Sequence, residues 1–317
     1  GRFVQDFGGG GLGTFGGHAH GIMRSNYERD AIRGPWQRDT AGTLAMHTTA
    51  ANEEPRARCY RAARLVSAQT GMTGALWYPQ RQPVTKSFEA MFEFQLVDAA
   101  EHCDDVRQTS RSYSEEVRTE VHKTCAKRGG DGFAFVVRDQ TGPLRNDTVG
   151  EVGAGLGYAG LTHTLAVEFD NWYNTRMAEP FDPHVAVHTR GAEPNSAHHA
   201  HRLGFTTDVP SFWRGRHTVK VAHTPNPNAA TLLAALESGA LRGVSGAVGA
   251  STAGLTGLLS VYIDDMSEPK LTVPLTMNTV LRPNSKTAYV GFTAATGSTF
   301  QVVEILAFNF SSAGRSY

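Results

Sequence analysis

Apolar residues recur at every second position, or in short runs, along most of this chain. Ten such segments are "GALWYP" (74–79), "FEAMFEFQL" (88–96), "GFAFVV" (132–137), "HTLAVEFD" (163–170), "HVAVHT" (184–189), "HTVKVAH" (217–223), "LLSVYIDD" (258–265), "LTVPLTM" (271–277), "TAYVGFTA" (287–294) and "FQVVEILAFNF" (300–310). A period of two places apolar side chains on one face of a β-strand, and turn-forming residues separate the segments. Helical periodicity is nearly absent. The pattern predicts an all-β protein, folded as an antiparallel β-sandwich.

The remaining segments divide the chain. Residues 1–40 are rich in glycine, and we expect an irregular N-terminal arm there that is ordered only if it packs on something. The sandwich is predicted to span 41–311, followed by a C-terminal tail at 312–317. Within it, residues 226–257 are an insertion rich in Ala, Gly and Leu, in which Asn228 could cap a short helix. The insertion is interpreted as a surface loop, and the alternative is a docking element for a partner protein.

Composition narrows the classes of function. Lys and Arg number 30, and Asp and Glu also number 30, so the formal net charge is +0. This balance argues against a general binder of nucleic acid or of anionic membranes. Charged residues are only 19% of the chain, which suits a protein of strands and turns. The apolar stretches are too short to span a bilayer.

Two of the three cysteines, Cys103 and Cys125, bracket a polar stretch between two strand-like segments. A disulfide between them would close a long loop and stabilise the fold by roughly 3 kcal/mol. The spacing alone equally allows two free thiols in a reducing compartment. Cys59 is left over, either free or paired with another chain. A disulfide would imply maturation in an oxidising space: the secretory route, the cell surface or the mitochondrial intermembrane space.

Two acidic residues interrupt an apolar strand at "VEFDNWYN" (167–174). Their spacing of two places Glu168 and Asp170 on one face of the strand, where neighbouring like charges repel. A shared proton, an arginine or a metal ion must neutralise them. Asn174 and Glu179 add oxygen atoms that suit calcium, and His184 adds an imidazole that suits a transition metal such as manganese.

This segment resembles the metal-binding motif of the legume (L-type) lectins, whose fold is the concanavalin A-like sandwich, or jelly roll. In that family Glu-x-Asp-x-aromatic-x-Asn is followed by an acid and then a histidine. The resemblance implies that the chain holds one Ca²⁺ and one Mn²⁺ beside a sugar site. The implied manganese ligands are Glu168, Asp170, Glu179 and His184, and the implied calcium ligands are Asp170, Asn174, Glu179 and the Trp172 carbonyl.

Three further motifs extend the resemblance over roughly residues 70–310. "GGDGFAFVV" resembles the first sugar-binding loop, in which a cis peptide precedes an aspartate. "GAGLGYAG" resembles the second, glycine-rich loop, and "VGFTAATG" resembles the start of the variable specificity loop around Ala295 to Ser298. The implied sugar-binding residues are Asp131, Gly153, Trp172, Asn174, Ala295 and Thr296. Proteins of this broad group also contain an excursion like that between Cys103 and Cys125, which favours their pairing.

Three departures from the family pattern bear on the metal site. Glu179 stands where the family usually has aspartate, and Asn171 replaces a small hydroxyl residue. Arg176 lies where another acid is common, and an arginine there could replace a metal by pairing with the carboxylates. Asp182 could substitute as a ligand.

The expected function is metal-dependent glycan binding without catalysis, in a secreted or cell-surface protein. Glycans or glycoproteins are the expected partners, with protein partners at the arm and the insertion as a further possibility. One alternative is a structural or assembly subunit whose sugar site is degenerate. A second is a laminarinase-type glycoside hydrolase, which is disfavoured because Tyr173 stands where that motif needs a second glutamate.

Smaller motifs add little. His198, His199 and His201 lie together in "NSAHHAHRLG" and could form a zinc site, but a solvated loop is the favoured interpretation. Asn146 and Asn309 begin glycosylation sequons. Since Asn309 lies in a predicted strand, Asn146 is the better acceptor.

Overall fold

The computed structural model describes most of the sandwich. Side chains and backbone are described for residues 62–102, 125–142, 144, 148–181, 183–228, 230 and 257–313, and the backbone alone for residues 2–6, 20–25, 48–49, 60–61, 103–111 and 117–124. Cys59, Asn146, Asp182 and most of the predicted insertion lie outside these residues. In the described part of the chain, no helix combines the length and the apolar character needed to cross a membrane.

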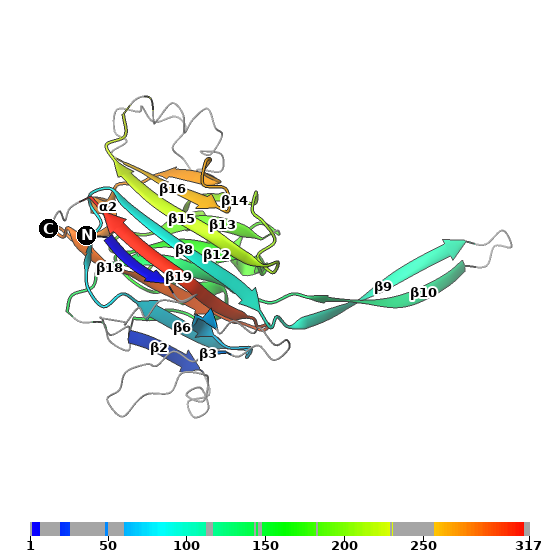
Figure 1. Cartoon of the computed structure of the whole chain (residues 1–317). Coiled ribbons are helices and arrows are strands. Elements are labelled where there is room, and N and C mark those ends of the chain that lie inside the picture. The colour runs from blue at the N-terminus through cyan, green and yellow to red at the C-terminus, as the bar shows by residue number, and fades with distance from the viewer. Residues whose placement is uncertain are drawn as a thin grey trace.

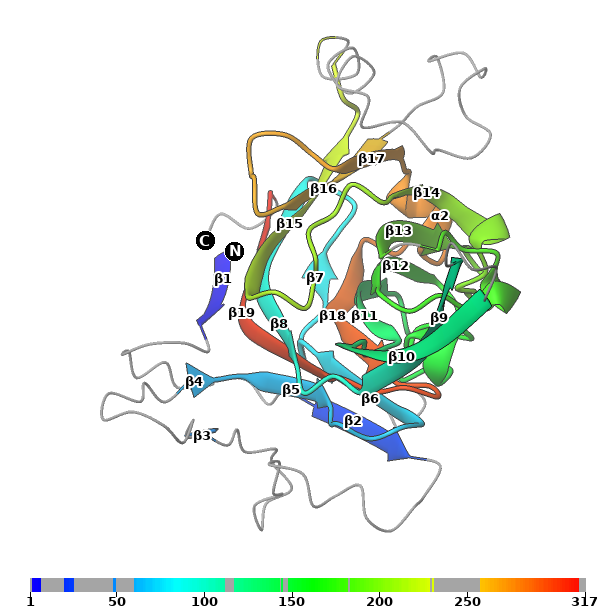
Figure 2. The same cartoon turned by 90° about the vertical axis from the view of Figure 1, so that its right-hand side faces the viewer.

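Two antiparallel sheets face each other (Figure 2). The seven-stranded sheet has the order β1 (Arg2–Asp6), β19 (Val302–Ser312), β8 (Phe88–Val97), β15 (Arg216–Pro225), β16 (Gly257–Ile263) and β17 (Leu271–Pro274), with β5 (Ala63–Val66) paired to β19. The eight-stranded sheet has the order β14 (Arg202–Thr206), β13 (His184–Thr189), β12 (Thr164–Asp170), β11 (Gly132–Arg138), β18 (Thr287–Ala295), β6 (Met72–Trp77) and β2 (His20–Ser25), with β7 (Gln82–Pro83) paired to β18.

Short elements complete the described fold. Two separate ribbons are formed by β9 (Glu101–Arg111) with β10 (Val117–Lys127), and by β3 (Thr48–Thr49) with β4 (Tyr60–Arg61). The helical turns are the 3-10 helices η2 (Gly153–Gly155), η3 (Thr175–Met177) and η4 (His199–His201), and the α-helix α2 (Met277–Val280). The predicted all-β sandwich is confirmed.

An aromatic cluster joins the two sheets. Phe92 on β8 is buried and contacts Phe135 at 6.1 Å, Phe169 at 5.8 Å and Phe292 at 5.0 Å between ring centroids, all on the facing sheet. Buried aromatic side chains of this size contribute most of the packing energy of a core. Phe169 lies between the two carboxylates on β12, so the same alternation packs the core and turns Glu168 and Asp170 to the opposite face.

Two segments of the predicted N-terminal arm, residues 2–6 and 20–25, are strands that pair with the sandwich. Strand β1 pairs with β19, and β2 pairs with β6, so the N-terminal region extends both sheets (Figures 1 and 2). Glycine-rich sequence surrounds these strands and hides them from a periodicity argument. Strands β1 and β2 form because they pair with the edges of strands that are distant in the sequence, and their own residues show no alternation of apolar and polar positions that would predict them.

The polar excursion after β8 is itself a β-ribbon. Figure 1 shows β9 and β10 projecting from one end of the sandwich. Their antiparallel register places Cys103 directly opposite Cys125. This backbone pairing is compatible with the predicted disulfide, which stays a prediction.

Candidate functional site

Strand register gathers the predicted site residues at one edge of the eight-stranded sheet. Asp170, the last residue of β12, lies opposite His184 on β13 and opposite Gly132 on β11. Gly132 in turn lies opposite Ala295 at the end of β18. Asp131, which precedes β11, therefore lies beside the acidic end of β12. The ends of β11, β12, β13 and β18 therefore meet at this edge.

Asp170 and Glu179 are buried together. One oxygen from each and one nitrogen of His184 lie within 4.8 Å of one another. Burial raises the pKa of Asp170 well above its ordinary value, and the negative charge of Glu179 raises it further. Burial also raises the pKa of Glu179 to about 8, although a hydrogen bond from the Asn174 backbone opposes this. Two such carboxylates require a proton or an external cation to neutralise them.

Arg176 does not supply that cation. It lies on η3 with an exposed side chain, and among the described residues it forms no ion pair with Asp170 or Glu179. The expectation that a nearby arginine could replace a metal is therefore not met by this arrangement. A bound cation or a retained proton remains.

Asn174 links the acidic group to Asp131. Its side-chain nitrogen donates a hydrogen bond to Asp131 Oδ2 at 3.2 Å, and its backbone N–H donates to Glu179 Oε1. Its side-chain oxygen is buried and has no hydrogen-bond partner. A buried amide oxygen without a donor is costly, and amide and carboxylate oxygens are the ligands that calcium prefers. The donor set formed with Asp170 and Glu179 therefore fits a calcium ion.

Asp131 lies in a narrow space between glycine backbones. The peptide bond between Gly130 and Asp131 is cis, as the sequence resemblance implied. A β-carbon added at Gly297 would lie 2.6 Å from Asp131 Oδ1, and one added at Gly153 would lie 3.8 Å from Oδ2. Burial raises the pKa of Asp131 to about 6, against the opposing hydrogen bond from Asn174. Its Oδ1 has no partner that meets hydrogen-bond geometry.

A second group surrounds Glu168. Its Oε1 lies 3.0 Å from His188 Nε2, 3.5 Å from His184 Nε2 and 3.6 Å from His199 Nε2. Its Oε2 accepts a 2.6 Å hydrogen bond from the Tyr158 hydroxyl. Burial alone would raise the pKa of Glu168, but the charge of His188 and the histidine hydrogen bonds hold it well below its usual range. Burial lowers the pKa of His199, which favours its neutral form.

Comparison with known proteins identifies the family of the chain. Residues 73–316 match the family model of the legume lectin domain. The chain belongs to the legume lectin family. Its structure is similar to lectin I-B4 from Griffonia simplicifolia in a metal-free form, at 16% identity and a TM-score of 0.51, covering 98% of this chain and 99% of that one.

Two further lectins are similar to this chain. Peanut lectin with a 9mer peptide matches at 15% identity and a TM-score of 0.49, covering 94% of this chain and 99% of that one. The lumenal domain of VIP36, in a Ca²⁺/Man3GlcNAc-bound form, matches at 15% identity and a TM-score of 0.46, covering 81% and 82%. At these identities the similarity concerns the fold alone.

Within this lectin fold, the side chains of Ala295 and Thr296 do not reach the site. Both are buried, and the Thr296 hydroxyl donates to the Gln69 carbonyl at 2.6 Å and accepts from the Met72 N–H at 2.9 Å. The Ala295 carbonyl accepts the Asp131 N–H. Their role is to hold the start of the variable loop, and the next residue, Gly297, lies against the Asp131 carboxylate instead.

Several aromatic residues lie beside the site. The Trp172 ring is half-buried against His102, with centroids 5.0 Å apart, and its backbone N–H donates to Asp170 Oδ1 at 2.8 Å. Tyr173, a neighbour of Trp172, forms an exposed ring pair with Phe181, which was not predicted, and the ring centroids are 5.0 Å apart. Phe181 is 78% exposed. Phe181 lies in a turn of the metal-binding segment, and an aromatic residue at such a position could have been recognised in the sequence as a candidate binding residue.

The interpretation of His198, His199 and His201 as a solvated loop was wrong for His199. This residue is 1% exposed, whereas His201 is exposed. The contacts that bury His199 come from β12, β13 and β14, so the local sequence pattern does not predict them. His188 and Tyr158 were missed for the same reason.

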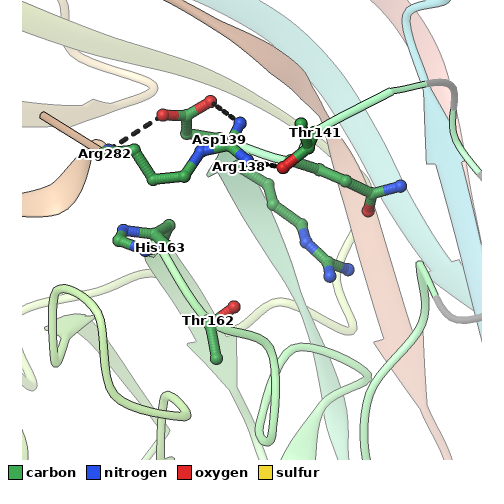
Figure 3. A pocket seen from close by; sticks show the side chains of 7 residues that line it. Arg138, Asp139, Thr141, Thr162, His163 and Arg282 are labelled. Atoms are coloured by element: carbon green, nitrogen blue, oxygen red, sulfur yellow. Dashed lines mark hydrogen bonds and ion pairs between the residues drawn. The ribbon is translucent and has the colours of Figure 1, made fainter. Parts of the chain in front are cut away.

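A separate pocket lies at the other end of β11 (Figure 3). It is lined by Arg138, Asp139, Gln140, Thr141, Thr162, His163 and Arg282. Asp139 accepts hydrogen bonds from the side chains of Arg81 at 2.5 Å and Arg282 at 2.7 Å, and from the Arg282 backbone at 2.9 Å. The two guanidinium groups hold its pKa well below the ordinary value despite burial. The protein thus neutralises this carboxylate itself.

Proposed function

We propose that this lectin domain binds glycans without catalysis, and that binding depends on divalent cations. The observation that supports this most strongly is the environment of Asn174. One end of its amide faces the buried Asp131 carboxylate, and the other end is a buried oxygen with no partner beside Asp170 and Glu179. A single side chain therefore joins an acceptor suited to sugar hydroxyls with a donor set suited to calcium.

Each residue has a defined part in this proposal. Calcium would be held by Asp170, Asn174, Glu179 and the Trp172 carbonyl, and a transition metal by Glu168, Asp170, Glu179 and His184. When bound, these ions supply the positive charge that the buried acids lack. Asp131 would accept hydrogen bonds from sugar hydroxyls, and the Asn174 amide nitrogen would donate. Gly153 and Gly297 place no side chain against the Asp131 carboxylate.

Aromatic residues beside Asn174 are proposed to contact the apolar face of the sugar. Trp172 is the proposed stacking partner for the sugar, as the family resemblance implies. The exposed Tyr173 and Phe181 pair offers an additional apolar surface next to Asn174. Apolar faces of sugar rings pack on aromatic rings because both surfaces are poorly solvated. Extended glycans, or sugars with apolar substituents, would use this pair.

The compartment follows from the same proposal. We place the mature protein in the secretory pathway or outside the cell, with Cys103 and Cys125 paired across the β9–β10 ribbon. The intermembrane space of mitochondria is the alternative oxidising compartment. Asn146 is the proposed glycosylation site. Intact mass before and after reduction and alkylation measures the disulfide directly.

A glycan array tests the function. Purified protein is applied with Ca²⁺ and Mn²⁺, and again after chelation. Binding should require the metals, and Asp131→Ala should abolish it while leaving the metal content unchanged. Asp208→Ala is the matched control, because the Asp208 side chain is 81% exposed and pairs with Lys270 on the surface. Binding that persists in chelator would contradict metal dependence.

An assembly subunit is the second candidate function. The observation that favours it is the long β9–β10 ribbon, which projects from the sandwich as an arm would (Figure 1). A protein that holds its metals but binds no glycan on the array would support this role. Catalysis is disfavoured, since legume lectins are non-catalytic carbohydrate-binding proteins.

A further inference from the structure

We propose that Glu168, His184 and His199 together form a transition-metal site of zinc type. His199 is absent from the ligand set that the sequence motif implies, so the donor set differs from the one expected for manganese. This inference deepens the proposed function, because it assigns the identity of the second ion. It rests on the geometry of the histidine cluster and not on any glycan.

The three ligand atoms form a compact triangle. Glu168 Oε1 lies 3.5 Å from His184 Nε2 and 3.6 Å from His199 Nε2, and the two nitrogens are 3.0 Å apart. Four-coordinate zinc has bonds of about 2.0–2.1 Å to N and O, which place neighbouring ligands about 3.3–3.4 Å apart. One ion can therefore contact all three atoms with only small movements of side chains.

The ligands are held from behind. Tyr158 donates to Glu168 Oε2 at 2.6 Å, and His188 Nε2 lies 3.0 Å from Oε1, so the carboxylate is oriented by two hydrogen bonds. His188 is fully buried, and the tautomer with its proton on Nε2 would donate to Glu168 Oε1 and leave the unpartnered Nδ1 without a proton. Hydrogen bonds of this kind fix metal ligands in place and raise metal affinity.

Local structure turns His199 inward. In the short turn η4, the His198 side chain accepts the Ala200 N–H at 3.1 Å, and Arg202 donates to the His199 carbonyl at 2.5 Å. The ring of Phe205 packs against the His199 ring at 5.5 Å. The turn therefore fixes one histidine in the interior and leaves His201 in solvent.

The donor chemistry selects the metal. Neutral imidazole nitrogens suit zinc, copper and nickel, whereas carboxylate and carbonyl oxygens suit manganese and calcium. Zinc also lies above manganese in the general order of affinity for such ligands. If zinc takes Glu168, His184 and His199, the oxygens of Asp170, Asn174 and Glu179 remain for calcium. The two ions then divide the buried acids between them.

Metal titration of the whole chain tests the proposal. Metal-free protein is titrated with Zn²⁺, Mn²⁺ and Co²⁺, with zinc content and the visible absorption of bound cobalt as readouts. We expect one zinc per chain, bound more tightly than manganese. His199→Ala should weaken zinc binding at least about tenfold, and should change the cobalt spectrum. His201→Ala, a histidine of the same turn, should change neither.

His199→Gln keeps most of the side-chain volume and replaces His199→Ala if the smaller residue prevents folding. Equal affinity for zinc and manganese, or equal effects of the His199 and His201 variants, would overturn the proposal. If the His199 variants bind zinc as tightly as the wild type, and calcium-dependent glycan binding persists, this inference is wrong and the proposed function stands. Zinc binding through His199 without any glycan binding defeats only the proposed function.

Discussion

Buried carboxylates lie at both ends of strand β11, and the protein treats them in opposite ways. At one end Asp139 accepts hydrogen bonds from Arg81 and Arg282, and its pKa is held well below the ordinary value. At the other end Asp170 and Glu179 lie together without an arginine or lysine partner among the described residues, and their pKa values are raised. The buried carboxylate of Asp139 is neutralised by arginine side chains of the protein. The carboxylates of Asp170 and Glu179 need a proton or a metal ion from solution.

The comparison predicts that the two ends respond differently to the loss of one charge. Asp139→Asn should lower the free energy of unfolding by about 3 kcal/mol, because two partly buried guanidinium groups lose their partner. The loss should be the same with and without metal. Denaturant unfolding of the variant under both conditions measures it. A loss that appears only in the presence of calcium would mean that the two ends are coupled.

Metal removal should act on the other end alone. Chelation of wild-type protein should lower the free energy of unfolding by about 2.7 kcal/mol if the free ion had been at about 100 times its dissociation constant. Asp170→Asn should remove this response, because the variant cannot bind calcium in the proposed way. Thermal melts with calcium and with chelator report the effect. Identical responses of wild type and variant would contradict the assignment of Asp170 as a ligand.

The sequence predicted the parts of this comparison that are local. Alternation identified the strands, and Glu168, Asp170, Asn174 and His184 were indicated as site residues because they lie in one strand, in the turn that follows and at the start of the next strand. His199 was interpreted as solvated because the residues that contact it on β12 and β13 are distant in the sequence, so the local pattern gave no sign of them. The two N-terminal strands were missed for the equivalent reason: each is defined by the edge that it joins.

The variable loop shows a finer limit. Position in the motif indicated Ala295 and Thr296 as sugar-binding residues, but hydrogen bonds to Gln69 and Met72 consume the Thr296 hydroxyl. The backbone of Gly297 lies against Asp131 instead. A motif identifies a loop, whereas the direction of each side chain depends on strands that are distant in sequence.

The raised pKa of Glu179 predicts a pH dependence for the metal-free protein. Its value of about 8 exceeds the ordinary value of 4.5, so the folded state retains a proton that the unfolded state releases. This stability is fully present below pH 4.5 and is lost as pH rises through 8. Unfolding midpoints at about pH 7 and about pH 9 measure this loss, and the Glu179→Gln variant controls for other groups that titrate in the same range.

Calcium should abolish this dependence, since the ion keeps the carboxylates ionised in the folded state. Glu179→Gln should abolish it as well, even without metal. A metal-free protein whose stability is unchanged between the two pH values would show that Glu179 is already ionised, and that some other cation faces it.

The smallest effect is expected at Arg176. Because this side chain is exposed and has no ion pair with the buried acids among the described residues, Arg176→Ala should change stability by less than about 0.5 kcal/mol. Calcium affinity should stay the same within about twofold, as expected for a solvent-screened charge. A large loss of stability in chelator would instead make Arg176 the hidden counter-ion of the site.

The most direct test of the account is a count of bound ions by native mass spectrometry. Wild-type protein equilibrated with calcium and zinc should hold one ion of each kind per chain. Asp170→Asn should lose the calcium, and Asp139→Asn, at the other end of β11, should keep both. A wild-type chain that holds no ion at saturating metal would contradict the account, because the buried acids would then be neutralised by protons.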